Sequence, residues 1–96
     1  MKKTIEQRAI DLLGLTVTDK IQGTTGIVTS VDFDLYGCIQ VVLTPKNSDK
    51  DNPKSGWLDI NRLEILDKKR AMEHPDFANK YKSFGEVNGP ADKPMK

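Results

Sequence analysis

Residues 27–44 read IVTSVDFDLYGCIQVVLT, and this stretch decides the fold. Its two apolar runs, 27–33 and 38–44, are rich in β-branched residues, which favour extended backbone. Between them the tripeptide Leu-Tyr-Gly at 35–37 is typical of a chain reversal, because glycine accepts positive φ without a Cβ clash. The pattern predicts a β-hairpin whose second strand, the most apolar of the chain, is central. Pro45 ends that strand, since proline cannot donate to a ladder.

Further strands are predicted on both sides of this hairpin. Residues 15–22 alternate between apolar and polar, and the Gly-Thr-Thr-Gly sequence at 23–26 makes the turn into the hairpin. Downstream, residues 56–60 and 62–66 form two more short strands separated by a tight turn. Residues 45–56 contain only turn formers and charges, which predicts an exposed loop.

Five short strands with tight turns favour a small closed barrel over a flat sheet with open edges. We therefore predict a mainly β fold, a five-stranded SH3-like barrel with an N-terminal helix and an extended C-terminal tail. An OB-fold has the same number of strands, but it usually carries a helix between strands three and four, where this sequence has a polar loop. The predicted division is an N-terminal helix at 1–13, the barrel at 14–66, and a short helix with an extended tail at 67–96.

The N-terminal helix is predicted from its caps. Thr4 followed by Gln7 matches a capping box, and Gly14 suits a C-terminal cap, so the helix is expected over residues 4–13. Apolar residues at helical spacing form a stripe that should lie against the barrel, namely Ile5, Ala9 and Leu12 or Leu13.

The C-terminal region changes character after the barrel. Residues 75–81 can form one or two helical turns, whereas residues 85–96 contain glycines, prolines and almost no core formers, which predicts disorder in the isolated chain. Four apolar residues are spaced as possible anchors onto a neighbouring molecule: Phe77, Tyr81, Phe84 and Val87.

The composition limits the classes of function. The chain has 96 residues, 15 Lys and Arg against 14 Asp and Glu, one Cys and one His. This length fits one domain, and the balanced charge argues against a nucleic-acid polymer as partner. One Cys and one His are too few for a tetrahedral zinc site, so we expect no metal and no cofactor. The N-terminal sequence lacks the apolar stretch of a signal peptide and no run could span a bilayer, which predicts a cytosolic protein.

Groups for catalysis are sparse. Cys38 could act as a nucleophile only with His74 beside it, and a buried structural thiol is the more common role at the start of an apolar strand. Two carboxylate pairs lie beside a turn or within the charged loop, where solvated turn residues are the usual interpretation: Asp32 with Asp34, and Asp49 with Asp51. We therefore predict that the protein is not an enzyme.

The turn at 23–26 is a candidate phosphate site. Its glycines expose backbone N–H groups, and the hydroxyls of Thr24 and Thr25 stand beside them. No Walker sequence follows, so a plain β-turn is the favoured alternative.

Aromatic and basic residues provide the other binding candidates. Tyr36 at its turn and Trp57 after the polar loop could stack on bases. Trp57 could equally cap the core. Arg62 and Lys46 could supply charge to a phosphate. Phe33, in contrast, is expected in the core.

Several segments together resemble a widespread family of small tailed-phage proteins with an SH3-like barrel. The similar segments are DKIQGTTGIV at 19–28, GCIQ at 37–40 with Pro45, WLD at 57–59 and RLE at 62–64, with a Gly-Pro pair at 89–90. A phage family of this kind includes the anti-CBASS sponges, which are non-enzymatic oligomers that sequester cyclic oligonucleotide signals of bacterial anti-phage defence. The resemblance implies immune evasion in the host bacterial cytoplasm, binding of a cyclic dinucleotide such as 3'3'-cGAMP, and a dimer or tetramer held by the N-terminal helix and C-terminal tail.

Two alternatives stay open. A small barrel with an extended arm also suits a structural or accessory protein of the phage head or tail. In addition, glycines and valines at Gly14, Val17, Gly23, Gly26 and Val28 are similar to the KOW pattern of ribosomal and transcription-factor barrels, which would indicate RNA or protein binding.

Overall fold

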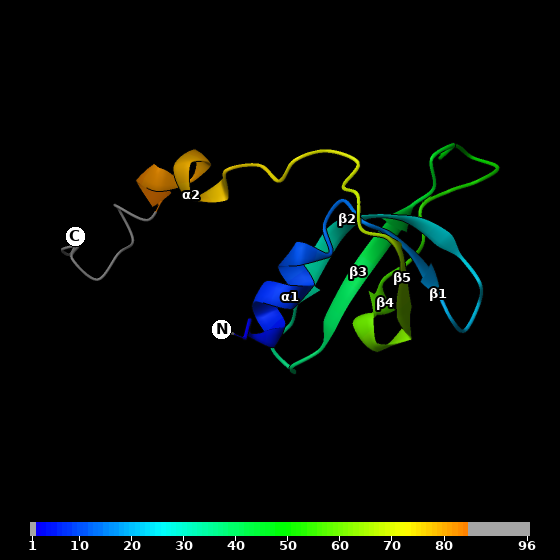
Figure 1. The fold of residues 1–96 in the computed structure, drawn as a ribbon, viewed down its shortest axis with the longest axis horizontal. Helices are drawn as coiled ribbons and strands as arrows, with labels where there is room; N and C mark the ends of the chain where they lie inside the picture. The colour runs from blue at the N-terminus through cyan, green and yellow to red at the C-terminus, as the bar shows by residue number, and fades with distance from the viewer. Residues whose placement is uncertain (1, 85–96) are drawn as a thin grey trace.

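A curved, five-stranded antiparallel sheet forms the body of the molecule (Figure 1). The structure is a computed structural model that describes residues 2–84. Along the chain the elements are α1 (Ile5–Asp11), β1 (Thr16–Asp19), β2 (Thr25–Phe33), β3 (Ile39–Thr44), β4 (Leu58–Asp59), the 3-10 turn η1 (Ile60–Arg62), β5 (Leu63–Asp67) and α2 (Phe77–Lys80). The predicted mainly β class, the five strands and the N-terminal helix are confirmed.

The strand order is β4-β3-β2-β1-β5, so the last strand lies beside the first, as expected for an SH3-like arrangement. The predicted closure is wrong, because β4 and β5 stand at the two edges and do not pair with each other. β4 has only two residues, and η1 follows it at once, so the chain turns away before a ladder to β5 can form. The predicted central strand, β3, is an interior strand, while β2 holds the middle position.

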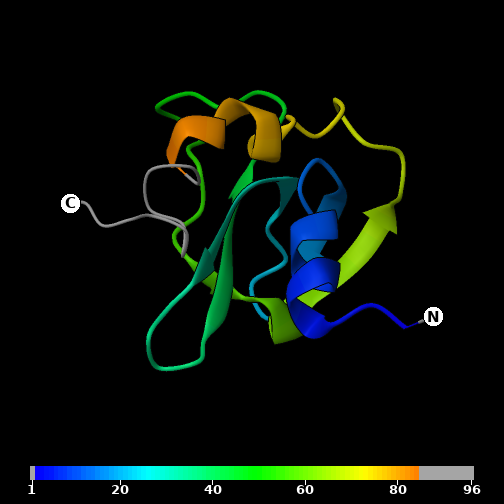
Figure 2. The same ribbon diagram turned by 90° about the vertical axis from the view of Figure 1, so that its left-hand side faces the viewer.

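The helix α1 lies across the open side of the curved sheet, between the β2–β3 hairpin and β5 (Figure 2). Its start matches the predicted capping box: the Thr4 hydroxyl accepts from the Gln7 amide, and the Gln7 side chain accepts from the Thr4 amide. Ala9 is buried, but Ile5 is half exposed, because it lies at the end of the helix beyond the edge of the core. Gly14 follows with a φ of 90° that other residues rarely adopt.

The core lies between the inner face of the sheet and α1. Its buried members come from four strands and the residue before β1: Leu15, Val17, Val28, Val41, Leu43 and Leu58. At Gly26 a Cβ atom would come within 3.0 Å of the Thr44 carbonyl group, so only glycine lets β2 and the end of β3 approach this closely.

Two large apolar residues near strand ends, Ile21 and Phe33, are exposed. β1 ends at Asp19, so Ile21 falls in the following turn and points into solvent. Phe33 is half exposed, and its predicted place in the core is wrong, because the β2–β3 hairpin continues past the region that α1 and the other strands cover.

After β5 the chain crosses back over the residues that join α1 to β1, and then leads away from the sheet. Ala71 donates its amide to the Gly14 carbonyl at 2.8 Å, and His74 Nε2 lies 2.8 Å from the Leu13 carbonyl oxygen. The predicted helical turns at 75–81 are confirmed by α2, which the Asp76 side chain caps by accepting from the Asn79 amide. The expectations for residues 85–96, with Val87 among them, lie outside the described residues.

The complete burial of Leu43 predicts how much stability its truncation removes. Leu43 is fully buried, so Leu43→Ala should lower the free energy of unfolding by about 2–5 kcal/mol. Leu35→Ala is the matched control, since that leucine is 92% exposed, and it should change stability by less than about 0.5 kcal/mol. Urea unfolding followed by circular dichroism measures both; equal effects would contradict this assignment of the core.

Candidate functional site

A polar cleft of about 470 Å³ lies between the β1–β2 turn and the loop that joins β3 to β4. The turn contributes Gln22, Gly23, Thr24 and Thr25, and the facing wall consists of Pro45, Asn52, Pro53, Lys54, Ser55, Gly56 and Leu58. Two of the predicted ligand-binding residues, Thr24 and Thr25, therefore line one cleft.

Backbone hydrogen bonds fix the turn side of this cleft. The Gly23 amide donates to the Asp19 carbonyl at 2.7 Å, and the Asp19 amide donates to the Thr24 carbonyl at 2.7 Å. Gly23 adopts a φ of 80°, which a side chain would strain. The chain reverses at residues 20–24, ahead of the predicted 23–26, because Thr25 and Gly26 already belong to β2; the Gly23 amide is occupied within this turn instead of being directed at a ligand.

The hydroxyls of Thr24 and Thr25 differ in their hydrogen bonds. The Thr25 hydroxyl lies 2.9 Å from the Thr18 hydroxyl, and the Thr18 hydroxyl also donates to the Thr24 carbonyl at 3.2 Å. Thr25 is thus tied to β1, whereas the Thr24 hydroxyl has no hydrogen bond to any described residue. Of the two, Thr24 has the hydroxyl that can turn to a ligand.

The loop side of the cleft is held to β3. Ser55 and Leu43 exchange two hydrogen bonds, from the Leu43 amide to Ser55 Oγ at 2.8 Å and from the Ser55 amide to the Leu43 carbonyl at 2.9 Å. Nearer the start of the loop, the Asp49 carboxylate accepts from the amides of Asp51 and Asn52. The predicted role of Asp49 as a turn residue is confirmed, and the loop has a defined shape around the cleft.

The cleft presents donors to a ligand. Lys54 is the charged group among its lining residues, and no carboxylate lines it. In the described part of the chain Lys54 has no ion-pair partner. Together with the Asn52 side-chain amide and the Thr24 hydroxyl, its ammonium group favours an anionic ligand, because charge-assisted hydrogen bonds to oxyanions are the stronger ones.

The wall of the cleft depends on a buried carboxylate. Asp19 is fully buried, and its side chain accepts from Arg62 Nε at 2.9 Å, from Arg62 Nη2 at 2.6 Å and from the Ile21 amide at 3.0 Å. Hydrogen bonding from Arg62 holds the pKa of Asp19 below its ordinary value of 3.8, with the Ile21 amide acting in the same direction. Arg62, predicted to hold a phosphate, thus directs two of its donors at Asp19.

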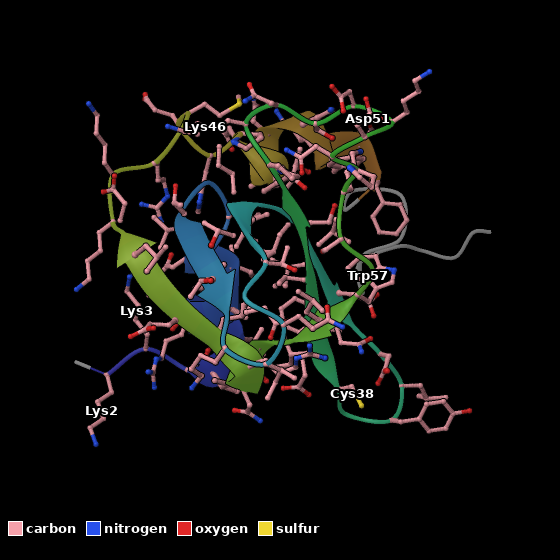
Figure 3. All side chains as sticks on the ribbon, turned by 90° about the vertical axis from the view of Figure 1, so that its right-hand side faces the viewer. Lys2, Lys3, Cys38, Lys46, Asp51 and Trp57 are labelled. Atoms are coloured by element: carbon pink, nitrogen blue, oxygen red, sulfur yellow. The ribbon has the colours of Figure 1, made fainter. Side chains whose placement is uncertain are left out.

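The other predicted residues lie outside the cleft. Tyr36 is 89% exposed at the tip of the β2–β3 hairpin, and β2 separates it from the β1–β2 turn (Figure 1). Trp57 is 49% exposed and lies just before β4, whose first residue, Leu58, is buried. Figure 3 places Lys46 near the top of the molecule, well apart from Trp57 on the right.

The Cys38 and His74 side chains are not brought together. Cys38 is exposed beside the hairpin tip, so its predicted burial is wrong: it precedes β3, whose first buried residue is Val41. Repulsion from Asp34, with some desolvation, raises the pKa of the Cys38 thiol, which disfavours the thiolate form. His74 accepts instead from Arg70 Nε at 2.8 Å near the start of β2. Asp34 accepts from the Tyr36 and Cys38 amides, which confirms its predicted turn role.

Sequence reasoning missed Asn52 and Lys54. Both lie in the loop predicted to be exposed, and its mixture of charges and turn formers carries no signal that singles them out. A second cleft, of about 370 Å³, was also missed: it lies between α1 and the end of β5, and Asp11 lines it together with four basic residues, namely Lys3, Arg8, Lys68 and Arg70. There Asp11 already pairs with Lys3, and this hydrogen bond lowers the pKa of Asp11.

Comparisons with known proteins give no identification: no protein-family model, curated protein or solved structure matches this chain. Within residues 2–84 no helix is long and apolar enough to cross a membrane.

The lowered pKa of Asp19 predicts a dependence of stability on pH. The contribution of the Asp19–Arg62 pair is fully present above about pH 4, the ordinary range of the carboxyl, and is lost as the pH falls through the lowered pKa of the folded state. Asp19→Asn should remove this part of the acid dependence. It should also lower the Tm at neutral pH by roughly 10 °C or more, because Arg62 loses its buried partner.

Thermal unfolding between pH 2 and pH 7 measures this effect. Asp49→Asn, which changes an exposed loop carboxylate, is the matched control and should leave the pH profile of the wild type in place. A Tm for Asp19→Asn that equals that of the wild type at every pH would show that the pair does not stabilise the fold.

Proposed function

We propose that this chain is a non-enzymatic binding protein of the host bacterial cytoplasm that sequesters a cyclic dinucleotide, whose phosphates bind in the polar cleft. One observation carries the proposal: the cleft offers an ammonium group, a side-chain amide and a hydroxyl at Lys54, Asn52 and Thr24, with no lining carboxylate to repel a phosphate. A cyclic dinucleotide carries two phosphodiester charges and meets this requirement.

The size of the cleft supports a small ligand. Its volume of about 470 Å³ falls within the range of about 300–1,000 Å³ that is usual for small-molecule sites. The fixed turn and the loop tied to β3 are preformed walls, so little ordering is needed upon binding. In this proposal Trp57 provides an aromatic ring beside Gly56, at the rim, for a base that projects out of the cleft.

The resemblance to phage proteins supports the same ligand class. Its longest segment, residues 19–28, contains Asp19, the whole β1–β2 turn and Thr24, and so covers one wall of the cleft. A sponge requires retention of its ligand without turnover, and a cleft lined by donors suits that role.

Calorimetric titration with 3'3'-cGAMP tests the proposal. We expect Lys54→Glu to weaken binding by at least about tenfold, since it removes a charge-assisted hydrogen bond and introduces repulsion. Thr24→Val should weaken binding by roughly threefold to tenfold through the loss of a neutral hydrogen bond.

Lys68→Glu is the matched control, because it makes the same change of charge in the second cleft, between α1 and β5. It should leave the affinity within about twofold of the wild type, as expected for a distant exposed charge screened by salt. Absence of heat with a panel of cyclic di- and trinucleotides, or binding that Lys68→Glu abolishes and Lys54→Glu does not, would contradict this site.

A structural role in the phage particle is the second candidate, and the exposed aromatic residues of α2 favour it. Phe77 and Tyr81 stand on a segment that projects from the barrel, where a neighbouring subunit of a particle could cover them (Figure 1). Stoichiometric amounts of the protein in purified particles, measured by mass spectrometry, would favour this function over the sponge.

A further inference from the structure

The second cleft, between α1 and the end of β5, collects cationic side chains from three separate parts of the chain (Figure 2). Lys3 precedes α1, Arg8 lies within it, and Lys68 and Arg70 follow β5. Four cationic groups against one lining carboxylate leave a surplus of three positive charges. This surplus is local, because the whole chain has a formal net charge of only +1. A cleft lined by charges of one sign attracts ligands of the opposite sign.

The backbone brings these cationic residues to the same place. Arg8 and Asp11 are three residues apart on α1 and therefore share one face of the helix. Lys68 directly follows β5, whose last residue pairs with the first residue of β1, so it lies level with the link between α1 and β1. Arg70 crosses that link, and its Nη2 atom donates to the Asp11 carbonyl at 2.8 Å. The second cleft is thus built by tertiary contacts between distant segments.

Asp11 accounts for two of the four cations. Lys3 Nζ donates to Asp11 Oδ2 at 2.5 Å, and Arg70 Nη2 lies 3.8 Å from Asp11 Oδ1, so both cationic groups lie against one carboxylate. The side chains of Arg8 and Lys68, in contrast, make no hydrogen bond or ion pair with any other of residues 2–84. Internal pairing therefore explains Lys3 and Arg70 and leaves two cations available to a ligand.

The nearest carboxylate in the sequence does not supply the missing partner. Asp67 stands next to Lys68 but does not line the second cleft. Its Oδ1 atom accepts from the Lys69 amide at 2.9 Å, in the turn that leaves β5. The surplus of positive charge is therefore not balanced from this side.

An apolar wall narrows the class of ligand. Leu12, Leu15 and Ile65 line the cleft beside the cations, and Ile65 is 43% exposed. A ligand that uses both kinds of wall needs a compact anionic group and a flat apolar part, and a nucleotide has both. A nucleoside diphosphate carries about three negative charges on adjacent phosphates, since its terminal phosphate alone has roughly −1.5 to −2 at neutral pH. That charge matches the surplus in the cleft.

We propose that the second cleft binds the pyrophosphate group of a nucleoside diphosphate, with the base against Leu12 and Ile65. Arg8, Lys68 and the part of Arg70 that Asp11 does not hold donate to the phosphate oxygens, because guanidinium and ammonium groups form charge-assisted hydrogen bonds with phosphate. Asp11 competes with the ligand for Lys3 and Arg70.

This inference does not depend on the ligand proposed for the polar cleft. The two clefts share no lining residue. Their ligands also differ in charge distribution: the two diester charges of a cyclic dinucleotide are single and are held apart on a ring, whereas the charges of a pyrophosphate group are adjacent. One cleft can therefore fail its test while the other passes.

Calorimetric titration of the full chain with ADP tests the second cleft. We expect a Kd on the order of 100 µM for ADP and at least about fivefold weaker binding of AMP, which has one phosphate in place of two. Lys68→Glu should weaken ADP binding by at least about tenfold, because it replaces an attraction with a repulsion. Lys54→Glu, which makes the same change of charge in the polar cleft, is the matched control and should leave ADP affinity within about twofold of the wild type.

A gain of affinity separates a ligand site from a merely structural cluster. Asp11→Asn removes the internal competitor, so ADP should bind at least about threefold more tightly. Asp49→Asn changes the net charge equally in a distant loop and should have no effect. Far-UV circular dichroism checks that each variant is folded. Absence of ADP binding to the wild type at about 2 mM, equal affinities for AMP and ADP, or unchanged binding by Lys68→Glu would overturn the proposal.

Discussion

The buried ion pair between Asp19 and Arg62 is the contact on which the rest of this structure depends. Asp19 ends β1 on the core side of the sheet, where a lone carboxylate would carry a large desolvation cost. Arg62 meets it from η1, 43 residues later in the chain, and the Arg62 carbonyl accepts from the Lys20 amide at 2.8 Å. Three hydrogen bonds thus join the end of β1 to the turn that precedes β5. They reinforce the beginning of the β1–β5 pairing, where Asp19 lies opposite Leu63.

Asp19 also shapes the polar cleft. Through its backbone Asp19 bonds Gly23 and Thr24, and through its side chain it bonds Ile21, so the whole β1–β2 turn is arranged around one aspartate. The opposite wall is held by Ser55 against Leu43 of the core strand β3. A ligand in the cleft would therefore lie between two walls that are each tied directly to the barrel, although both consist of loop residues.

The molecule separates its two kinds of surface. Donor groups gather in the polar cleft, and apolar groups gather where the segment after β5 meets the start of β2, at Leu13, Ile27, Val28, Met72, Pro75 and Phe77. This separation fits a chain of nearly balanced charge, in which specificity comes from the local placement of a few groups and not from a general electrostatic field.

The sequence by itself determined the local structure. The capping box of Thr4 and Gln7, the β-branched runs of β2 and β3 and the turn at Gly23 depend on residues close together in the chain, so their patterns could be interpreted without coordinates. Thr24 and Thr25 were predicted for the same reason. Local patterns, however, do not reveal which distant segments meet.

Tertiary structure alone decided how these pieces combine. It paired Arg62 with Asp19 instead of leaving its donors for a phosphate, set Lys54 across the cleft from Thr24, and left Phe33 and Cys38 beyond the core. It also left the sheet open, because η1 turns the chain away immediately after the two residues of β4. The physical reason is that burial and pairing depend on neighbours in space, and the neighbours of these residues come from other parts of the chain.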